Sequence, residues 1–278
     1  MKLQERRPGD NDLNCLLMGA SGFLGCCVGD ELVRHGVRFI GTCRQSDSAV
    51  SRGYIPFNFP HDPFFAVSRA SRTDFAIVCA RLTEPSSCDE RTFVTKFDEL
   101  LAAIQSSMRS ATVSKIVYVS SDAVFSGKKG RYIETDIPEP ATQYGRRQFL
   151  AEQAVQRLDT PYLVVRPSYI FDADEPGRDK RLSRLEATIR AGDPVKAYSN
   201  VFKSPVNVRS LARLIVENTL SDRTGILHAA ADRKSIYEFF SDSLTALGLQ
   251  DKSGLILSEL NAEPGDTSLS SQFDGYRQ

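Results

Sequence analysis

The sequence predicts an α/β fold, a doubly wound parallel sheet. Residues 13–18 form an apolar run with the length of a buried strand, followed by a glycine-rich turn, an amphipathic segment and a second strand at residues 37–42. Strand-like and helical segments then alternate, as at residues 74–80, 92–108 and 115–119. Such alternation is typical of parallel sheets with helices on both faces, whose ligands lie beyond the carboxyl ends of the strands.

The turn after the first strand carries Gly19, Gly22 and Gly25 at intervals of three, and Gly36 supplies the stop of the following helix. In such a turn the first glycine allows the tight bend, and the second lets the backbone approach a pyrophosphate. The third lets the helix lie close to the strand, with its N-terminus toward the phosphates. A glycine-rich turn without a ligand is the alternative. Because strand and helix flank the motif in the required order, we favour a dinucleotide cradle.

The end of the second strand bears on the choice of cofactor. Folds of this kind that bind NAD usually place Asp or Glu about 20 residues after the glycines, to hold the ribose 2′-hydroxyl. Here Thr42, Cys43 and Arg44 occupy that place, and no acid appears before Asp47. Because the planar guanidinium of Arg44 can pair with a 2′-phosphate, we expect NADP, with NAD as the alternative. A solvated surface arginine is the other interpretation of Arg44.

Length and charge limit the function classes. The chain has 278 residues, enough for a large α/β domain, and its 35 basic and 35 acidic residues cancel. This balance gives no indication of a nucleic-acid or membrane partner. Residues 1–12 lack the apolar region of a signal peptide, and no later stretch reaches the length of a membrane span. We therefore expect a cytoplasmic protein.

Cysteines and histidines carry no sign of a metal site. The six cysteines form no C-x-x-C pair and are expected to be reduced core thiols. Among the histidines, His35 ends a helix, His61 lies in a proline-rich loop, and His228 is expected to follow a strand. None has a partner at ligand spacing, so no metal is expected.

Two hydroxyl side chains point to carbonyl chemistry. Ser121 lies at the tip of the strand at residues 115–119, and Tyr144 begins a helix after the loop at residues 127–142. Reduction of a carbonyl by hydride needs one group that hydrogen-bonds the carbonyl oxygen and one acid that protonates it. Ser121 and Tyr144 suit these two roles. By composition alone, simple packing explains a tyrosine equally well.

Several motifs together identify a family. Besides the glycine motif, these are Val119-Ser120-Ser121-Asp122-Ala123-Val124-Phe125, Tyr132-x-Glu134-x-Asp136-x-Pro138, Tyr144-Gly145, and Leu163-Val164-Val165-Arg166-Pro167. In this order they resemble the extended short-chain dehydrogenase/reductases, and within them the sugar-nucleotide reductase branch that contains dTDP-4-dehydrorhamnose reductase. The resemblance covers nearly the whole chain, from about residue 13 onward.

The resemblance implies a Rossmann domain at residues 1–165 and a small C-terminal substrate-binding lobe at residues 166–278, with a strand that can return to the Rossmann sheet. It implies a nucleotide-sugar substrate and a homodimer through the helices at residues 92–108 and 144–158. Substrate binding falls on Ser121, Asp122 and Tyr144, although Asp122 could equally cap the following turn. The implied cofactor-binding residues are Gly19, Ser21, Gly22, Phe23, Leu24, Gly25, Arg44, Ala80, Arg81, Tyr144 and Gln148.

One departure from the family concerns catalysis directly. The family's active-site lysine stands four residues after the tyrosine, where this chain has Gln148. The lysine charge assists proton transfer, and its N–H groups hold the nicotinamide ribose; Gln148 can supply only the hydrogen bond. Arg147 lies about 100° round the helix and cannot take the place of the lysine. We expect the loss to slow catalysis by about tenfold to a thousandfold.

The sequence leaves three functions open. The first is an NADP-dependent reductase of a nucleotide-activated 4-keto-6-deoxysugar, with Tyr144, Ser121 and Gln148 as its catalytic residues. The second is a catalytically weak or inactive NAD(P)-binding regulatory subunit, since a relative of this branch regulates methionine adenosyltransferase. The third is a sugar-nucleotide epimerase or dehydratase. Retention of Tyr144 and Ser121 favours the reductase, and Gln148 favours the regulatory subunit.

Overall fold

The computed structural model of the protein describes residues 13–44, 52–64, 73–83, 88–108, 114–172, 179–261 and 265–273. Its centre is a seven-stranded sheet with the order β11-β6-β5-β4-β1-β2-β3, in which every neighbouring pair is parallel. The strands are β1 (Asn14–Met18), β2 (Arg38–Cys43), β3 (Ile55–Pro56), β4 (Phe75–Val78), β5 (Lys115–Val119), β6 (Tyr162–Pro167) and β11 (Gly225–Ala229). The predicted α/β class with a doubly wound sheet is confirmed. The strand order reverses between β1 and β4, where ligands of such sheets bind.

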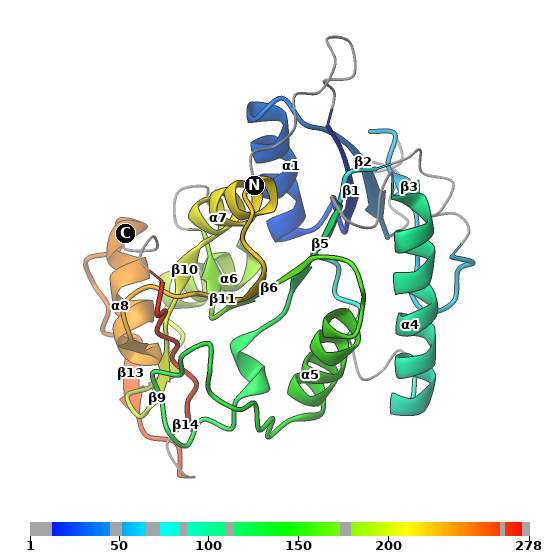
Figure 1. Ribbon diagram of the computed structural model, residues 1–278. Helices are drawn as coiled ribbons and strands as arrows, with labels where there is room; N and C mark the ends of the chain where they lie inside the picture. Colours follow the sequence, from blue (N-terminus) through cyan, green and yellow to red (C-terminus); the bar gives the residue numbers. More distant parts are fainter. Residues whose placement is uncertain are drawn as a thin grey trace.

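Helices cover both faces of this sheet (Figure 1). On one face α1 (Phe23–Arg34) packs against α7 (Val208–Leu220), and on the other α4 (Glu90–Ser107) packs against α5 (Gln143–Gln156). β1 shows why both faces need cover. Cys15 and Leu17 join the core under α1, whereas Leu16 and Met18 join the core under α4 and α5. This alternation follows from the two-residue period of a strand.

One local signal in the sequence ends α1, and another begins α5. Gly36 follows α1 with a φ of +69°, the left-handed conformation that ends helices. Thr142 begins α5, and its side-chain oxygen accepts a hydrogen bond from the Gly145 backbone N–H at 3.0 Å. The Thr142 cap therefore sets the place of Tyr144 in the first turn of α5.

A second layer of short elements forms the lobe at the lower left of Figure 1. Its helices are α6 (Lys180–Arg190) and α8 (Ile236–Ala246), and Leu182, Leu185 and Phe239 lie in its own apolar core. The lobe's strands are β7 (Ile170–Phe171), β8 (Val195–Tyr198), β9 (Val201–Lys203), β10 (Val206–Asn207), β12 (Lys234–Ser235), β13 (Leu255–Ser258) and β14 (Gly265–Asp266). Although they come from the second half of the chain, α7 and β11 belong to the layers of the large sheet.

One local expectation is wrong. His228 does not follow a strand but lies inside β11, fully buried, with Nδ1 at 3.0 Å from the carbonyl oxygens of both Tyr132 and Ser270. A buried imidazole keeps its place in a strand when polar partners satisfy its ring nitrogens. These partners are distant in sequence, so the strand pattern alone did not reveal them.

All six cysteines lie in the described part of the chain, and none forms a disulfide. Within the same ranges no group of three or more His, Cys, Asp or Glu side chains is arranged to hold a metal ion. Likewise, none of the helices described is both long enough and apolar enough to pass through a lipid bilayer.

Candidate active site

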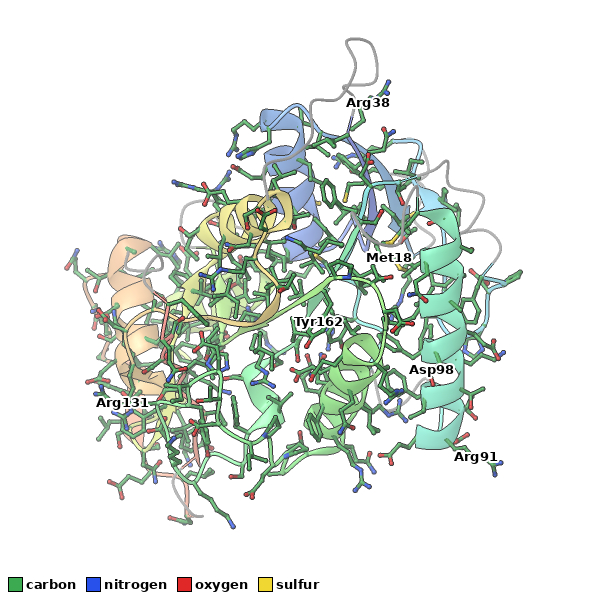
Figure 2. The ribbon with its side chains drawn as sticks, viewed as in Figure 1. Met18, Arg38, Arg91, Asp98, Arg131 and Tyr162 are labelled. Atoms are coloured by element: carbon green, nitrogen blue, oxygen red, sulfur yellow. The ribbon has the colours of Figure 1, made fainter. Side chains whose placement is uncertain are left out.

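The glycine turn at the end of β1 leaves no room for side chains. Gly19 has a φ of +86°, and a Cβ there would lie 2.8 Å from Ala80 Cα. A Cβ on Gly25 would lie only 2.0 Å from the Gly19 carbonyl oxygen, so α1 approaches β1 as closely as its backbone allows. Figure 2 labels Met18, the last residue of β1 before this turn. The turn has the tight bend and the close helix approach of a dinucleotide cradle.

The N-terminus of α1 is open to an anion. Gly22 is the N-cap residue, and no side chain caps the helix. The first backbone N–H groups of a helix have no partner within it, so those of Phe23 and Leu24 need an acceptor from elsewhere. Ser21 and Gly22 are exposed, while Leu24 is buried beneath the turn. An uncapped, accessible helix start next to tight glycines fits a pyrophosphate.

Neighbouring strands hold the cradle in place and bring the other expected cofactor residues to it. Thr42 at the end of β2 accepts the Gly19 N–H on its side chain at 3.1 Å and the Ala20 N–H on its carbonyl at 2.8 Å. Arg44 is exposed just beyond this strand. Ala80 lies against Gly19 beyond the end of β4, and Arg81 beside it is exposed. Asp47 lies outside the described residues.

Ser121 and Tyr144 lie on two elements that touch through a backbone contact. Ser121 caps the short 3-10 helix η1 (Asp122–Val124), where its Oγ accepts the Ala123 N–H at 3.2 Å and donates to Asp122 Oδ1 at 3.1 Å. Tyr144 is half-buried in the first turn of α5, and the next residue, Gly145, touches η1: a Cβ there would lie 1.9 Å from the Ala123 carbonyl oxygen. β5 lies two strands from β1, which is about 10 Å, so Ser121 at the end of β5 lies at that spacing from the cradle along the carboxyl edge of the sheet.

Gln148 joins Tyr144 to the buried interior. Its Nε2 donates to Tyr144 Oη at 2.8 Å, and its Oε1 accepts from Tyr118 Oη at 2.5 Å. Gln148 is 5% exposed and Tyr118 2% exposed. Arg147 does not take the lysine's place, as expected: its guanidinium donates to the Cys88 carbonyl and lies 5.4 Å from the Phe93 ring centre.

Asp122 connects the end of β5 to the lobe. It is 5% exposed, and its Oδ2 accepts hydrogen bonds from Ser168 Oγ at 2.9 Å, Lys203 Nζ at 2.8 Å and Thr267 Oγ1 at 2.9 Å. The side chain that caps η1 is Ser121, so Asp122 is not the capping residue that the alternative interpretation required. Three lobe segments thus meet one carboxylate directly beside Ser121.

A buried ion pair lies beneath the site. Arg166 and Glu152 are 1% and 0% exposed, and Arg166 donates Nε to Oε1 at 3.0 Å and Nη2 to Oε2 at 2.7 Å. Ser120 Oγ also donates to Glu152, and the Phe125 ring centre is 5.2 Å from the guanidinium carbon. Neither Glu152 nor Tyr118 is identified by the sequence analysis. A signal existed: Tyr144, Gln148 and Glu152 recur every four residues, which places polar groups on one helix face.

The comparison with protein families agrees with this architecture. Residues 13–264 match the family described as RmlD substrate binding domain. The chain belongs to this family. The resemblance to the dTDP-4-dehydrorhamnose reductase branch is therefore confirmed, and so, at the level of the family, is the expectation of an NAD(P)-dependent oxidoreductase that acts on sugar nucleotides.

Curated relatives are distant but extensive. The spore coat polysaccharide biosynthesis protein SpsK of Bacillus subtilis is 23% identical over 257 residues, covering 90% of this chain and 84% of that protein. The probable low-salt glycan biosynthesis reductase Agl14 of Haloferax volcanii is 25% identical over 218 residues, 77% of this chain and 73% of its own. Methionine adenosyltransferase 2 subunit beta of Danio rerio is 23% identical over 268 residues, 90% and 79% of the two chains.

Solved structures share the fold over almost the whole chain. A hypothetical dTDP-4-dehydrorhamnose reductase from Sulfolobus tokodaii has a TM-score of 0.74 and 26% identity, covering 96% of this chain and 97% of its own. The Bacillus anthracis dTDP-4-dehydrorhamnose reductase in complex with NADP has a TM-score of 0.74 and 18% identity, covering 93% of this chain and 90% of its own. MoeE5 in complex with UDP-glucose and NAD has a TM-score of 0.71 and 21% identity, covering 94% of this chain and 90% of its own. Neighbours of this fold therefore bind either nicotinamide cofactor.

Proposed function

We propose that the protein is an NADP-dependent reductase of a nucleotide-activated 4-keto-6-deoxysugar. The observation that carries the proposal is the position of Tyr144. Gln148 donates a hydrogen bond to its hydroxyl at 2.8 Å, and the adjacent Gly145 touches the turn that Ser121 caps. A phenol and a serine hydroxyl on two elements that touch at a parallel sheet's carboxyl edge suit protonation and binding of a carbonyl oxygen.

The residues divide the work in the following way. The bound nicotinamide cofactor supplies the hydride for the carbonyl carbon. Ser121 turns its hydroxyl from Asp122 to the substrate oxygen and holds it. Tyr144 Oη accepts the Gln148 N–H, so its own hydrogen is directed away from Gln148 and passes to the same oxygen. Since Gln148 carries no charge, the proton leaves Tyr144 without the electrostatic help that a lysine would give.

The cradle at residues 19–25 would hold the pyrophosphate on backbone N–H groups, and the uncapped start of α1 supports this assignment. Arg44 would contact the adenosine ribose and its 2′-phosphate, which favours NADP over NAD. Ala80 and Arg81 would border the path toward the nicotinamide.

The lobe supplies the substrate side of the proposal. The half-buried Lys203, held by the buried Asp122 carboxylate at 2.8 Å, would face the sugar, where its ammonium donates to hydroxyl groups, and Asp122 would orient Ser121 and Lys203 toward the substrate. The MoeE5 complex with UDP-glucose supports a nucleotide-sugar ligand for this fold. We further propose a cytoplasmic homodimer formed through α4 and α5, which light scattering of the purified protein would test.

The deciding experiment follows NADPH absorbance after mixing the protein with dTDP-, GDP- and UDP-linked 4-keto-6-deoxysugars, with NADH in parallel. We expect turnover of at least one substrate, with NADPH preferred. Absence of turnover with every substrate, in both the natural protein and Gln148→Lys, would overturn the proposal.

A second function has a specific observation in its favour. Gln148 stands in the lysine's place, and the beta subunit of methionine adenosyltransferase is among the relatives. A regulatory subunit would keep the cradle and lose efficient chemistry. It predicts NADPH binding without turnover, even after Gln148→Lys. The third function, an epimerase or dehydratase, predicts a converted sugar with no net consumption of NADPH.

A further inference from the structure

A chain of hydrogen bonds runs from the core to the proposed proton donor. Tyr118 lies in β5, and its hydroxyl donates to Gln148 Oε1 at 2.5 Å; Gln148 Nε2 then donates to Tyr144 Oη at 2.8 Å. Within the described residues, Gln148 Oε1 is the acceptor of the Tyr118 hydroxyl. Tyr118 is 2% exposed, so water offers no substitute acceptor.

The buried Tyr118 hydroxyl decides the direction in which these hydrogen bonds run. A carboxamide has one accepting and one donating end, and a half-turn of its plane exchanges them. In the opposite orientation, Gln148 would accept the hydrogen of Tyr144 and donate to Tyr118. The Tyr118 hydrogen would then be buried without an acceptor, and leaving a buried donor unsatisfied is unfavourable. In the orientation seen in the structure, the buried Tyr118 hydrogen has its acceptor, and the phenolic hydrogen left over is that of the half-buried Tyr144.

The protonation of Tyr118 is constant across working conditions. Burial raises the pKa of Tyr118 well above its usual value of 10.0, and the neighbouring Tyr144 and Glu152 raise it further. Tyr118 is therefore an O–H donor at any pH at which the protein is assayed.

We propose that Tyr118 is a positioning residue for the reductase reaction: by holding the Gln148 carbonyl, it forces the Gln148 N–H onto Tyr144 and keeps the Tyr144 hydrogen free for the substrate. This rests on the proposed function for its catalytic consequence. In a site that lacks the lysine, the direction of the hydrogen bonds replaces a charge as the means of preparing the acid. The specific role of Tyr118 thus depends on glutamine at position 148.

The kinetic test is a double-mutant cycle between positions 118 and 148. In Tyr118→Phe the carboxamide is free to turn and accept the Tyr144 hydrogen, so we expect kcat to fall about 3- to 10-fold, with KM nearly unchanged. In the Gln148→Lys background the side chain has only donors, and the same substitution should change kcat less than about 2-fold. Tyr162→Phe, in β6 and labelled in Figure 2, is the matched control and should leave kcat unchanged. An equal loss in both backgrounds would overturn the proposal, because it would mean a structural defect only.

A second measurement needs no turnover. The Gln148 carboxamide signals in a nitrogen-15 NMR spectrum are identified by their loss in Gln148→Lys. We expect these signals to move in Tyr144→Phe, and to shift or double in Tyr118→Phe as the carboxamide samples both orientations. Unchanged signals in Tyr118→Phe would refute the inference even in an active enzyme. If they change but no sugar nucleotide is reduced, the hydrogen-bond chain stands and the proposed function fails.

Discussion

Gly145 in α5 lies in direct contact with the backbone of Ala123 in η1: a Cβ on Gly145 would fall 1.9 Å from the Ala123 carbonyl oxygen. This contact joins the helix that carries Tyr144 to the turn that Ser121 caps. The two hydroxyl residues are more than 20 positions apart in the sequence, yet Tyr144 is next to Gly145 and Ser121 lies two positions before Ala123. The contact explains why glycine follows Tyr144 in the sequence: a larger residue would not fit against η1.

Gly145→Ala should separate the two elements and damage catalysis more than folding. A displacement of about 1 Å at a reacting group can cost about 100-fold in rate. We expect a loss of this order in kcat, measured by NADPH oxidation. Gly265→Ala is the control, because a Cβ there would have its nearest neighbour at 3.9 Å. Normal kcat in Gly145→Ala would mean that the contact does not set the site.

Gln148→Lys should raise activity. The added ammonium stabilises the phenolate that Tyr144 becomes after proton transfer, and we expect an increase in kcat of about 10-fold or more. Gln153→Lys places the same change on the exposed face of the same helix and should leave kcat as it is. A decrease in kcat in Gln148→Lys would show that this site works through the orientation of Gln148 alone.

Removal of either partner of the buried Arg166–Glu152 pair should destabilise the protein strongly. Glu152→Gln leaves the guanidinium of Arg166, 1% exposed, without its counter-charge, at a cost of about 3–5 kcal/mol in unfolding free energy. The exposed pair of Arg146 and Glu90 is the comparison, and Glu90→Gln should cost about 1 kcal/mol or less. Urea denaturation of both variants measures the difference. Equal costs would contradict the role given to the buried pair.

Stability should fall as the pH drops below about 6.5. Burial lowers the pKa of His228 from its usual value of 6.5, so below that pH the unfolded chain takes up a proton that the folded protein still refuses. Stability from this group is therefore complete above pH 6.5 and is lost toward lower pH. Urea midpoints between pH 7.5 and 5.5 would show a smaller slope in His228→Gln. The exposed His61→Gln should keep the slope of the natural protein, and identical slopes in all three would contradict this account.

Protonation of Glu134 should cause a second loss of folding stability at lower pH. Burial tends to raise its pKa, but hydrogen bonds from Ser271 and from the backbone N–H groups of Gln272 and His228 outweigh burial and lower it. A lowered carboxyl pKa stabilises the folded state above the unfolded value of 4.5 and loses this effect as the pH falls further. In urea midpoints, Glu134→Gln should flatten the stability curve below pH 4.5, and because the Glu134 charge raises the pKa of His228, its removal should extend the His228 step to lower pH.

The parts of the fold that depend on local pattern were predictable from the sequence. The strand at β1, the glycine turn and α1 each follow from apolar spacing and from the geometry that glycine permits. Ser121 and Tyr144 could be found because each follows a recognisable boundary between elements. Their roles remain predictions, as do those of the cradle residues, Arg44 and Asp122.

Partners that meet only in three dimensions were not predictable. Tyr118 has the pattern of a core strand residue, and nothing in its neighbourhood along the chain indicates a hydrogen bond to Gln148, 30 positions later. The Arg166–Glu152 pair joins neighbouring elements 14 positions apart, and the hydrogen bond from Thr267 to Asp122 joins residues 145 positions apart. Periodicity identifies the face of an element but does not name the side chain across from it.

The most direct test of the central claim is the turnover of Tyr144→Phe on the sugar nucleotide that the natural protein reduces. The substitution removes the proposed proton donor and keeps the ring, and loss of a general acid typically costs about 100- to 10,000-fold. We predict a loss of this size in kcat, with NADPH affinity retained and Tyr162→Phe unaffected. Turnover by Tyr144→Phe at the natural rate would contradict the account.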